Sequence, residues 1–522
     1  MKKAFLAAIL AFSLLHCADL LAADKDEDSF QPSLSTQKFS FAQRIDFLFL
    51  PHDQSLFIAE RIFFLDEGDS FSIENYSQKV KESIAQFSLD RSPSDVFSLE
   101  FPPEITPASK IRKNYSRAAF QIGTLNMIAW TFNRFIMKES WANISLESIL
   151  TNLQSGFAWD IDTFRTNQLG HPWHGAIHYS IGRANGLGFL ESTLFSTLGS
   201  LTWEIFLESI TPSTNDLFMN TLGGITLGEV LYKISDLIID ESSIGLERAL
   251  RETFAFLINP AFGFRAFSGE AFRTGSPPES HYYSFDLPFG AFSLPDDKTI
   301  FLLAGDLEYK DFLKDDVSFI SPYEWFSLNI RLGFHDSGLM DKEIFTTGII
   351  TGRKVKNGAA GLFGVFDYIN SYALDKMSAV GVGPGLVILT VSDSDLFFNS
   401  SGVLSFILGG SSPTFNSPKF HFGLKTDDPY YFGPGLLGRI KMELGKKGVG
   451  SIDTGFSQYW VHSIFDEANE FLSILSFNLK CDVTDRSQVS FGYDYYLRRG
   501  TLHDQSFTGG KPALRALYIL KF

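Results

Sequence analysis

Residues 323–334 read YEWFSLNIRLGF and alternate between apolar and polar side chains. Every even position from 326 to 334 is apolar, while Ser327, Asn329 and Arg331 occupy odd positions. Successive side chains of a β-strand point to opposite faces, so the segment is predicted to be a strand with one apolar and one polar face.

The same period of two recurs after residue 280 and predicts an antiparallel sheet of about twelve strands. Their length of roughly 10–12 residues suits tilted transmembrane strands better than the shorter strands of most soluble sheets. Their apolar positions are rich in aromatic side chains, as in the lipid-facing band of a barrel. The strands are expected at 281–292, 298–310, 323–335, 342–353, 359–369, 375–391, 395–410, 430–445, 449–462, 470–484, 487–499 and 512–522.

The chain ends in strand register, because Leu514, Ala516, Tyr518, Leu520 and Phe522 share one face. This ending resembles the terminal signal of bacterial outer-membrane barrels, which the barrel-assembly machinery reads. The resemblance implies a transmembrane β-barrel over 280–522 in the cell outer membrane, with outer-membrane lipid as a partner and the assembly machinery contacted through Phe522. A soluble β-sandwich with a helical insert and a binding role gives the same alternation and is the alternative.

The composition narrows the possible partners. The 522 residues include 44 Lys and Arg against 60 Asp and Glu, a net charge of −16, which argues against nucleic acid. A mean hydropathy of +0.03 with 20% charged residues excludes overall disorder and a polytopic helical membrane protein. The 54 Phe residues are an unusual excess, and the predicted lipid-facing band would account for much of it.

The N-terminus has the features of an export signal. Lys2 and Lys3 precede an apolar stretch over 4–15, so residues 1–23 are predicted to be a signal peptide cleaved near Ala23. Lipidation at Cys17 is the alternative. Residues 24–109 are predicted to form a flexible acidic lead followed by an irregular segment.

Residues 110–270 change to a helical period and are predicted to form a helical domain, which makes the fold class α+β. Each helix is interrupted by Glu, Arg, Asn or Ser, so none is expected to span a bilayer. The domain is expected to be periplasmic, to lie on the inner leaflet, or to fill the barrel lumen. The helices are expected at 115–137, 172–185, 189–208, 223–239 and 245–257.

Candidate catalytic residues fall within this helical segment. His171 is a candidate general base, and Glu204 is a candidate carboxylate to orient it, with Glu208 one turn further on. His174 and His178 are four residues apart, so one helix face can present both to a metal. Gly175 follows His174, so the HExxH zinc-protease motif is absent, and no cofactor is predicted.

A structural role for these polar residues is the competing interpretation. In it, Glu204 and Glu208 are partnered by Arg183, Arg248 or Arg251 in a buried network that fixes the helix packing. The predicted members of the network are Arg183, Asn185, Glu208, Asn215, Asp216 and Glu229.

Several motifs in residues 167–269 resemble a family. The stretches NQLGHPWHGAIHYSIGRANG, SLTWEIFLE, PSTNDLFMNTLGGITLGEVLYKISD and NPAFGFRAFSG are similar to those of an exported bacterial family known only as a domain of unknown function. In that family, tyrosine commonly replaces His178 and another polar residue can replace His174, which counts against a metal pair. The resemblance implies export and a helical block ahead of a β-rich region, and it brings no activity with it.

The functional expectation is therefore an outer-membrane barrel protein with a structural or envelope-transport role. A membrane-embedded hydrolase of lipid or envelope material is the alternative, with His171 or His174 as the general base and Glu204 or Glu208 to orient it. Whether the protein is an enzyme is left open by the sequence.

Overall fold

The computed structural model describes residues 112–522 apart from a few short stretches. The predicted signal peptide, Cys17 and the whole predicted segment 24–109 lie outside the described residues. The gaps are 160–161, 268, 270–280, 296–298, 315–318, 336–337, 372, 374, 393, 414–419, 422–423, 426–429, 465–466 and 503–504.

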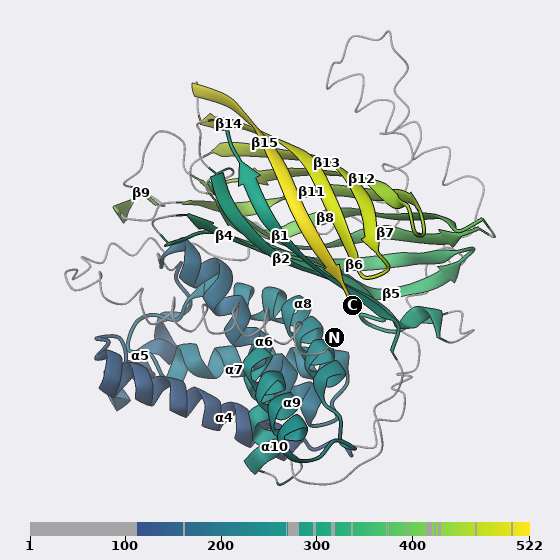
Figure 1. Ribbon diagram of the computed structural model, residues 1–522. Helices are drawn as coiled ribbons and strands as arrows, with labels where there is room; N and C mark the ends of the chain where they lie inside the picture. The colour runs from purple at the N-terminus through teal and green to yellow at the C-terminus, as the bar shows by residue number, and fades with distance from the viewer. Residues whose placement is uncertain are drawn as a thin grey trace, which may run out of the picture. The chain divides into compact units, whose positions relative to one another are not determined.

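Within the described residues, twelve strands pair antiparallel into one closed ring (Figure 1). The ring closes because β1 pairs with β15, drawn in yellow, and β5 pairs with β6. The twelve are β1 Tyr283–Ser293, β2 Thr299–Lys310, β4 Trp325–His335, β5 Gly338–Val355, β6 Gly358–Ser371, β7 Asp375–Val391, β8 Leu396–Pro413, β11 Tyr430–Lys446, β12 Gly450–His462, β13 Ala468–Thr484, β14 Ser487–Leu502 and β15 Gln505–Lys521.

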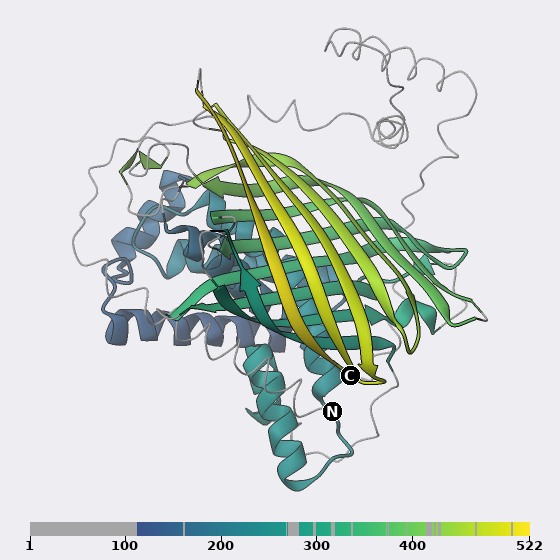
Figure 2. The same cartoon turned by 45° about the horizontal axis from the view of Figure 1, so that its top comes forward.

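Each predicted strand overlaps one of these twelve, so the predicted barrel is confirmed and the soluble sandwich is wrong. The short strand β3 (Phe319–Ile320) adds to β5, and β9 (Phe420–His421) pairs with β10 (Leu424–Lys425). The strands share a steep common tilt, which closure of a sheet into a barrel requires (Figure 2).

Contacts across the ring identify its inward face. Arg439 on β11 donates a hydrogen bond to Asp367 on β6 and another of 3.0 Å to Thr347 on β5, although neither strand is its neighbour. Tyr459 on β12 also donates to Asp367, at 2.9 Å. Since directly paired residues share a face, these contacts fix which side chains of each strand point inward. The inward face carries these polar side chains together with a buried apolar cluster that includes Phe363, Val365 and Leu437.

The outward face is apolar, and its two sides differ. On β13, β14 and β15 six large outward side chains are 37–62% exposed, and we call them the bare wall: Leu475, Phe477, Phe491, Tyr493, Leu514 and Tyr518. On β4 to β7 six outward side chains are at most 5% exposed, and we call them the covered wall: Phe326, Leu328, Ile344, Phe366, Tyr368 and Val380.

The helices form what we call the helical block, residues 115–267. Among the described residues, no helix has both the length and the apolar character needed to cross a bilayer. The elements are α4 Tyr115–Phe132, the π-helix η4 Asn133–Met137, α5 Leu146–Ser155, the π-helix η5 Thr166–Gly170, α6 His171–Ala184, α7 Phe189–Phe206, α8 Thr214–Ile238, α9 Gly245–Ile258, the 3₁₀ helix η6 Pro260–Gly263 and α10 Phe264–Phe267.

Two boundaries differ from the expected ones for local reasons. Helix α8 begins nine residues before the predicted position, because the Ser213 hydroxyl caps it by accepting from the Asp216 backbone N–H at 3.2 Å. Helix α5 was not predicted; it is short, and Ser145 and Ser148 cap its start reciprocally. The other predicted helices agree with α4–η4, α6, α7 and α9 to within two residues.

The covered wall is buried by the helical block. Side chains of α8, among them Leu227, Val230 and Ile234, share one apolar cluster with Phe366 and Tyr368. Because these strand residues flank the inward Asp367, they point out of the barrel. The contacts therefore lie on the outside of the barrel, and they contradict the prediction that the block fills the lumen.

Helix α8 crosses the covered wall from β8 to β2. Near its start the Met219 sulfur lies beside Gly409, and near its end the Lys233 ammonium lies 5.3 Å from the Tyr309 ring centroid. The strand residues beneath it form a row of direct pairs, Leu307–Leu328–Thr346–Phe366–Val380. The helix thus lies alongside the strands rather than beyond their ends.

Candidate functional site

His171 is the first residue of α6 and lies beside two carboxylates. Its Nε2 is 3.4 Å from Asp216 Oδ1 and 4.0 Å from Asp162 Oδ2. His171, which precedes Pro172, was predicted to be a general base oriented by a glutamate. Of the two carboxylates, that of Asp216 is nearer to the ring nitrogen. Asp216 was predicted only as a member of the polar network.

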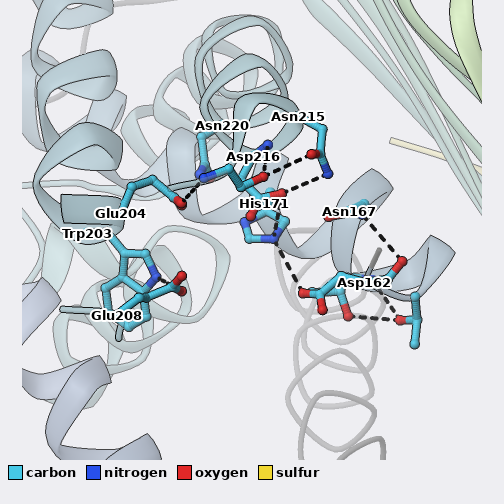
Figure 3. A network of polar contacts seen from close by, with 12 residues as sticks. Asp162, Asn167, His171, Trp203, Glu204, Glu208, Asn215, Asp216 and Asn220 are labelled. Carbon is cyan, nitrogen blue, oxygen red and sulfur yellow. Dashed lines mark hydrogen bonds and ion pairs between the residues drawn. The ribbon is translucent and has the colours of Figure 1, made fainter. Parts of the chain in front are cut away.

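Glu204 belongs to the same network as His171 (Figure 3). Glu204 Oε2 accepts from the Ser213 backbone N–H at 2.8 Å, and the Ser213 hydroxyl donates to Asn215 Oδ1 at 2.9 Å. The Asn215 amide then donates to Asp216 Oδ1 at 3.1 Å. Glu204 and Asp216 are both buried, so the predicted base and glutamate are joined through the residues that start α8.

Glu208 has a different role from Glu204, although the two lie one turn apart. The Trp203 indole N–H donates to Glu208 Oε1 at 2.6 Å, and the Asn152 amide donates to the Glu208 backbone carbonyl at 2.9 Å. These contacts fix the end of α7 against α5. Buried polar groups of this kind specify packing when their hydrogen bonds are made.

The arginines predicted to partner Glu204 and Glu208 bind other carboxylates. Arg183 Nε lies 2.9 Å from Glu229 Oε2, and that oxygen also accepts from the Tyr179 hydroxyl at 2.7 Å. Arg251 pairs with Glu247 and Asp240, and Arg248 pairs with Glu252. The ion pairs of these arginines are therefore between α6 and α8 and around α9, rather than with Glu204 and Glu208.

Glu229, at the centre of the Arg183–Glu229–Tyr179 cluster, has no exposed surface. Burial, reinforced by the Glu229 carboxylate, raises the pKa of Tyr179 well above its usual value, so the phenol stays a hydrogen-bond donor. Although burial opposes it, Glu229 raises the pKa of Arg183. Asn185, the remaining predicted member, ends α6 and donates to Gln121 on α4 at 2.6 Å.

His174 and His178 lie on one face of α6, as predicted, with ring centroids 4.4 Å apart. Both rings direct Nε2 at Asn126 Oδ1, at 3.2 and 2.8 Å, and the Asn126 amide donates to the Gly199 carbonyl at 3.1 Å. Burial, with a smaller contribution from His171, lowers the pKa of His174 to about 4; burial also lowers the pKa of His178. Both rings are therefore neutral at pH 7, with Nε2 as donor.

This arrangement favours a hydrogen-bonded pair over a metal pair. A metal would need the Nε2 lone pairs that the neutral donors do not offer. Among the described residues, no group of three or more His, Cys, Asp and Glu side chains is placed to hold an ion.

Two polar residues that the sequence analysis did not select join the block to the barrel. The Asn167 amide on η5 donates to the Tyr430 hydroxyl at 2.6 Å, and Gln168 Oε1 accepts from the Ser378 hydroxyl at 2.8 Å. Both side chains are fully buried. Their signal in the sequence was limited to two adjacent amides immediately before the LGHP motif.

Comparison with protein families shows one match. Residues 156–261 match a domain of unknown function (DUF3943), which confirms the family resemblance over about that range. The match includes α6, α7 and α8 and ends within η6, so it covers the residues of Figure 3. Comparison with curated proteins gives no match.

Solved structures with some similarity are outer-membrane barrels. OmpT of Vibrio cholerae is 8% identical over 46% of this chain and 97% of its own, with a TM-score of 0.21. The β domain of the Bordetella autotransporter BrkA is 11% identical over 47% and 100%, with a TM-score of 0.21. An anion-selective porin from Comamonas acidovorans is 7% identical over 47% and 99%, with a TM-score of 0.20. At these values the likeness supports no functional inference, and the strand pairing itself establishes the barrel.

Proposed function

We propose that this chain is a structural protein of the bacterial outer membrane, with its barrel in the lipid and its helical block fixed to the outside of the barrel. The bare wall is the observation that carries the proposal. Its large apolar side chains form a continuous outward face on three neighbouring strands, and an exposed apolar surface of that kind needs a lipid or protein partner.

The contacts between inward side chains favour a barrel with a blocked lumen over an open channel. The Arg439–Asp367 pair joins β11 to β6, and the Lys441 ammonium on β11 donates to Asn329 on β4. A passage for envelope material along the barrel axis would have to break these cross-barrel bonds. This supports the structural role over the transport role.

The proposed orientation of the barrel puts the edge where the helical block joins β1 on the periplasmic side, with the block itself alongside the strands. It is supported by the strand order, since β1 begins and β15 ends at the same edge, where Phe285 and Phe522 exchange backbone hydrogen bonds. In outer-membrane barrels the edge with short turns is the periplasmic one. The turns 356–357, 447–449 and 485–486 lie at this edge together with the longer connection 311–324, whereas the longest connection between barrel strands, 414–429, lies at the opposite edge.

Export, membrane insertion and barrel folding can be tested together. We expect the protein to stay with the membrane during carbonate extraction and to change its gel mobility on heating, because a folded barrel resists detergent until heated. Quantitative release by carbonate would overturn the proposal.

The His171–Asp216 pair supports a second candidate function, hydrolysis of lipid or envelope material. The His171 side chain is 13% exposed and has a carboxylate beside it, as a general base requires. Under this proposal His171→Ala abolishes hydrolysis while the heat-dependent mobility of the barrel is unchanged. A loss of the folded block in this variant would assign His171 to structure instead.

A further inference from the structure

The helix α4 has an apolar face that the fold leaves exposed. Phe120, Met127, Ile128 and Phe135 are spaced i, i+7, i+8 and i+15, which places them on one side, and they are 74%, 48%, 60% and 63% exposed. The opposite side of α4, with Ala118 and Ile122, is buried in the block. A helix with apolar side chains on both sides is not expected to leave either side in water.

A second exposed apolar row lies on the neighbouring helix α7. Leu190, Leu194 and Leu198 follow the i, i+4, i+8 spacing and are 59%, 56% and 47% exposed. The two helices are in contact, because the Asn126 amide of α4 donates to the Gly199 carbonyl of α7. The apolar surface therefore extends over more than one helix.

The charges around α4 have the sign opposite to that of the whole chain. Residues 112–138 contain five cations and no Asp or Glu, although the chain carries a net charge of −16; one of the five, Lys113, is paired with Glu191 of α7 at 2.9 Å. The cations flank the apolar row, with Arg117 near its start and Arg134 and Lys138 near its end. An exposed apolar helix face flanked by cations is typical of helices that lie in the headgroup region of an anionic membrane.

The place of the block on the barrel brings this surface to the membrane. Because α8 lies alongside the strands of the covered wall, the block occupies positions where bare strands would meet lipid. The side of the block turned away from the barrel then borders the lipid around it. This step rests on the proposed outer-membrane location.

We propose that the α4 row docks on the anionic phospholipid surface of the membrane that holds the barrel. Phe120, Ile128 and Phe135 enter the boundary between headgroups and acyl chains, and Arg134 and Lys138 bind phosphate groups. The row does not span the bilayer, in keeping with the length and polarity of α4–η4. The block is thus held by the covered wall on one side and by lipid on the other.

The experiment uses the full chain in vesicles of phosphatidylethanolamine and phosphatidylglycerol, with Cys17 and Cys481 replaced by Ser. An environment-sensitive fluorophore is attached in turn at Ile128→Cys on the row, at Phe491→Cys on the bare wall and at Lys356→Cys in the exposed β5–β6 turn. Vesicles with and without a lipid-borne quencher are compared. We expect loss of most emission at positions 128 and 491 and little loss at 356.

The outcomes separate the two proposals. Quenching at 491 without quenching at 128 would overturn lipid docking and leave the barrel proposal intact, whereas no quenching at either position would overturn the barrel proposal itself. A blue-shifted emission at 128 without quenching would show that protein rather than lipid covers the row. That result would also overturn lipid docking. In the variant Arg134→Glu/Lys138→Glu we expect quenching at 128 to fall while quenching at 491 is unchanged; unchanged quenching at 128 would overturn the role of the cations.

Discussion

The covered wall and the bare wall come from the same alternation on strands of the same barrel, yet they have different partners. Phe366 on β6 is fully buried against helices, whereas Phe491 on β14 is 59% exposed. Both point outward, and each has an inward polar neighbour, Asp367 after Phe366 and Ser490 before Phe491. The difference shows that alternation determines which face of a strand is apolar, while contacts distant in the sequence determine what that face meets.

The largest expected effect comes from truncating one phenylalanine on each wall. Phe366→Ala removes a ring buried between β6 and the block, and it should cost about 3–5 kcal/mol of block stability, as buried Phe truncations do. Phe491→Ala should leave the block unchanged. Urea unfolding followed by tryptophan fluorescence measures this, because five of the seven Trp residues lie in the block. Equal effects on the block would refute the distinction between the walls.

A charge placed on the bare wall should have the next largest effect. Leu475→Lys puts an ammonium on the outward face of β13, and a lysine in the lipid-facing band costs about 2–4 kcal/mol near the midplane. Val449→Lys, in the exposed turn after β11, is the matched control. We expect fewer heat-modifiable barrels in vesicles for the first variant only. If both variants assemble like the wild type, the bare wall does not face lipid.

A methyl group at the α6–α8 crossing should have a smaller effect. A Cβ at Gly224 would lie 2.6 Å from the backbone carbonyl carbon of Gly175, so Gly224→Ala should destabilise the block by about 1–3 kcal/mol. At Gly123 on α4 nothing lies within 4 Å, and Gly123→Ala should stabilise by about 0.5–1 kcal/mol through helix propensity. Hydrogen exchange of α8 amides distinguishes them. Protection that is unchanged in Gly224→Ala would mean that the crossing can relax.

Acidification should also destabilise the block, through its buried histidines. The pKa of His174 is about 4 in the folded block and 6.5 in the unfolded chain, so the unfolded state binds the proton first as the pH falls. Stability is therefore complete above about pH 6.5 and declines toward pH 4, by about 1.4 kcal/mol per pH unit for each such histidine. Urea unfolding at pH 7.5 and 5 measures the decline, and His174→Gln should reduce it. An undiminished decline in this variant would assign the pH dependence elsewhere.

The barrel was predictable from the sequence because its information is local. Each strand shows the period of two over its own length, and Tyr323–Phe334 alone already separates Asn329 and Arg331 from the apolar face. The helices were predictable for the same reason, apart from α5 and the start of α8. The start of α5 depends on the reciprocal cap of Ser145 and Ser148, and the start of α8 depends on the Ser213 cap. A hydrophobic pattern does not show such caps.

The partners within the candidate site were less predictable. Helical spacing correctly placed His174 and His178 on one face, but not the Asn126 amide from α4 that binds both rings. It also selected Glu229 and Arg183 without indicating that they bind each other across α6 and α8. These partners are 46–52 residues apart, and a hydrogen bond over that separation depends on the helix crossing rather than on spacing.

The sequence by itself determined that this chain has twelve alternating strands and a polar-interrupted helical segment, because both periods are properties of short stretches of backbone. Only the tertiary structure decided that the helical block lies on the outside of the barrel rather than in its lumen. Phe366 on β6 and Phe491 on β14 are the same residue type on the same face of a strand, so burial of one and exposure of the other depends on shape. The row beneath α8 fits that helix, and Asn167 and Gln168 form their hydrogen bonds to the barrel there.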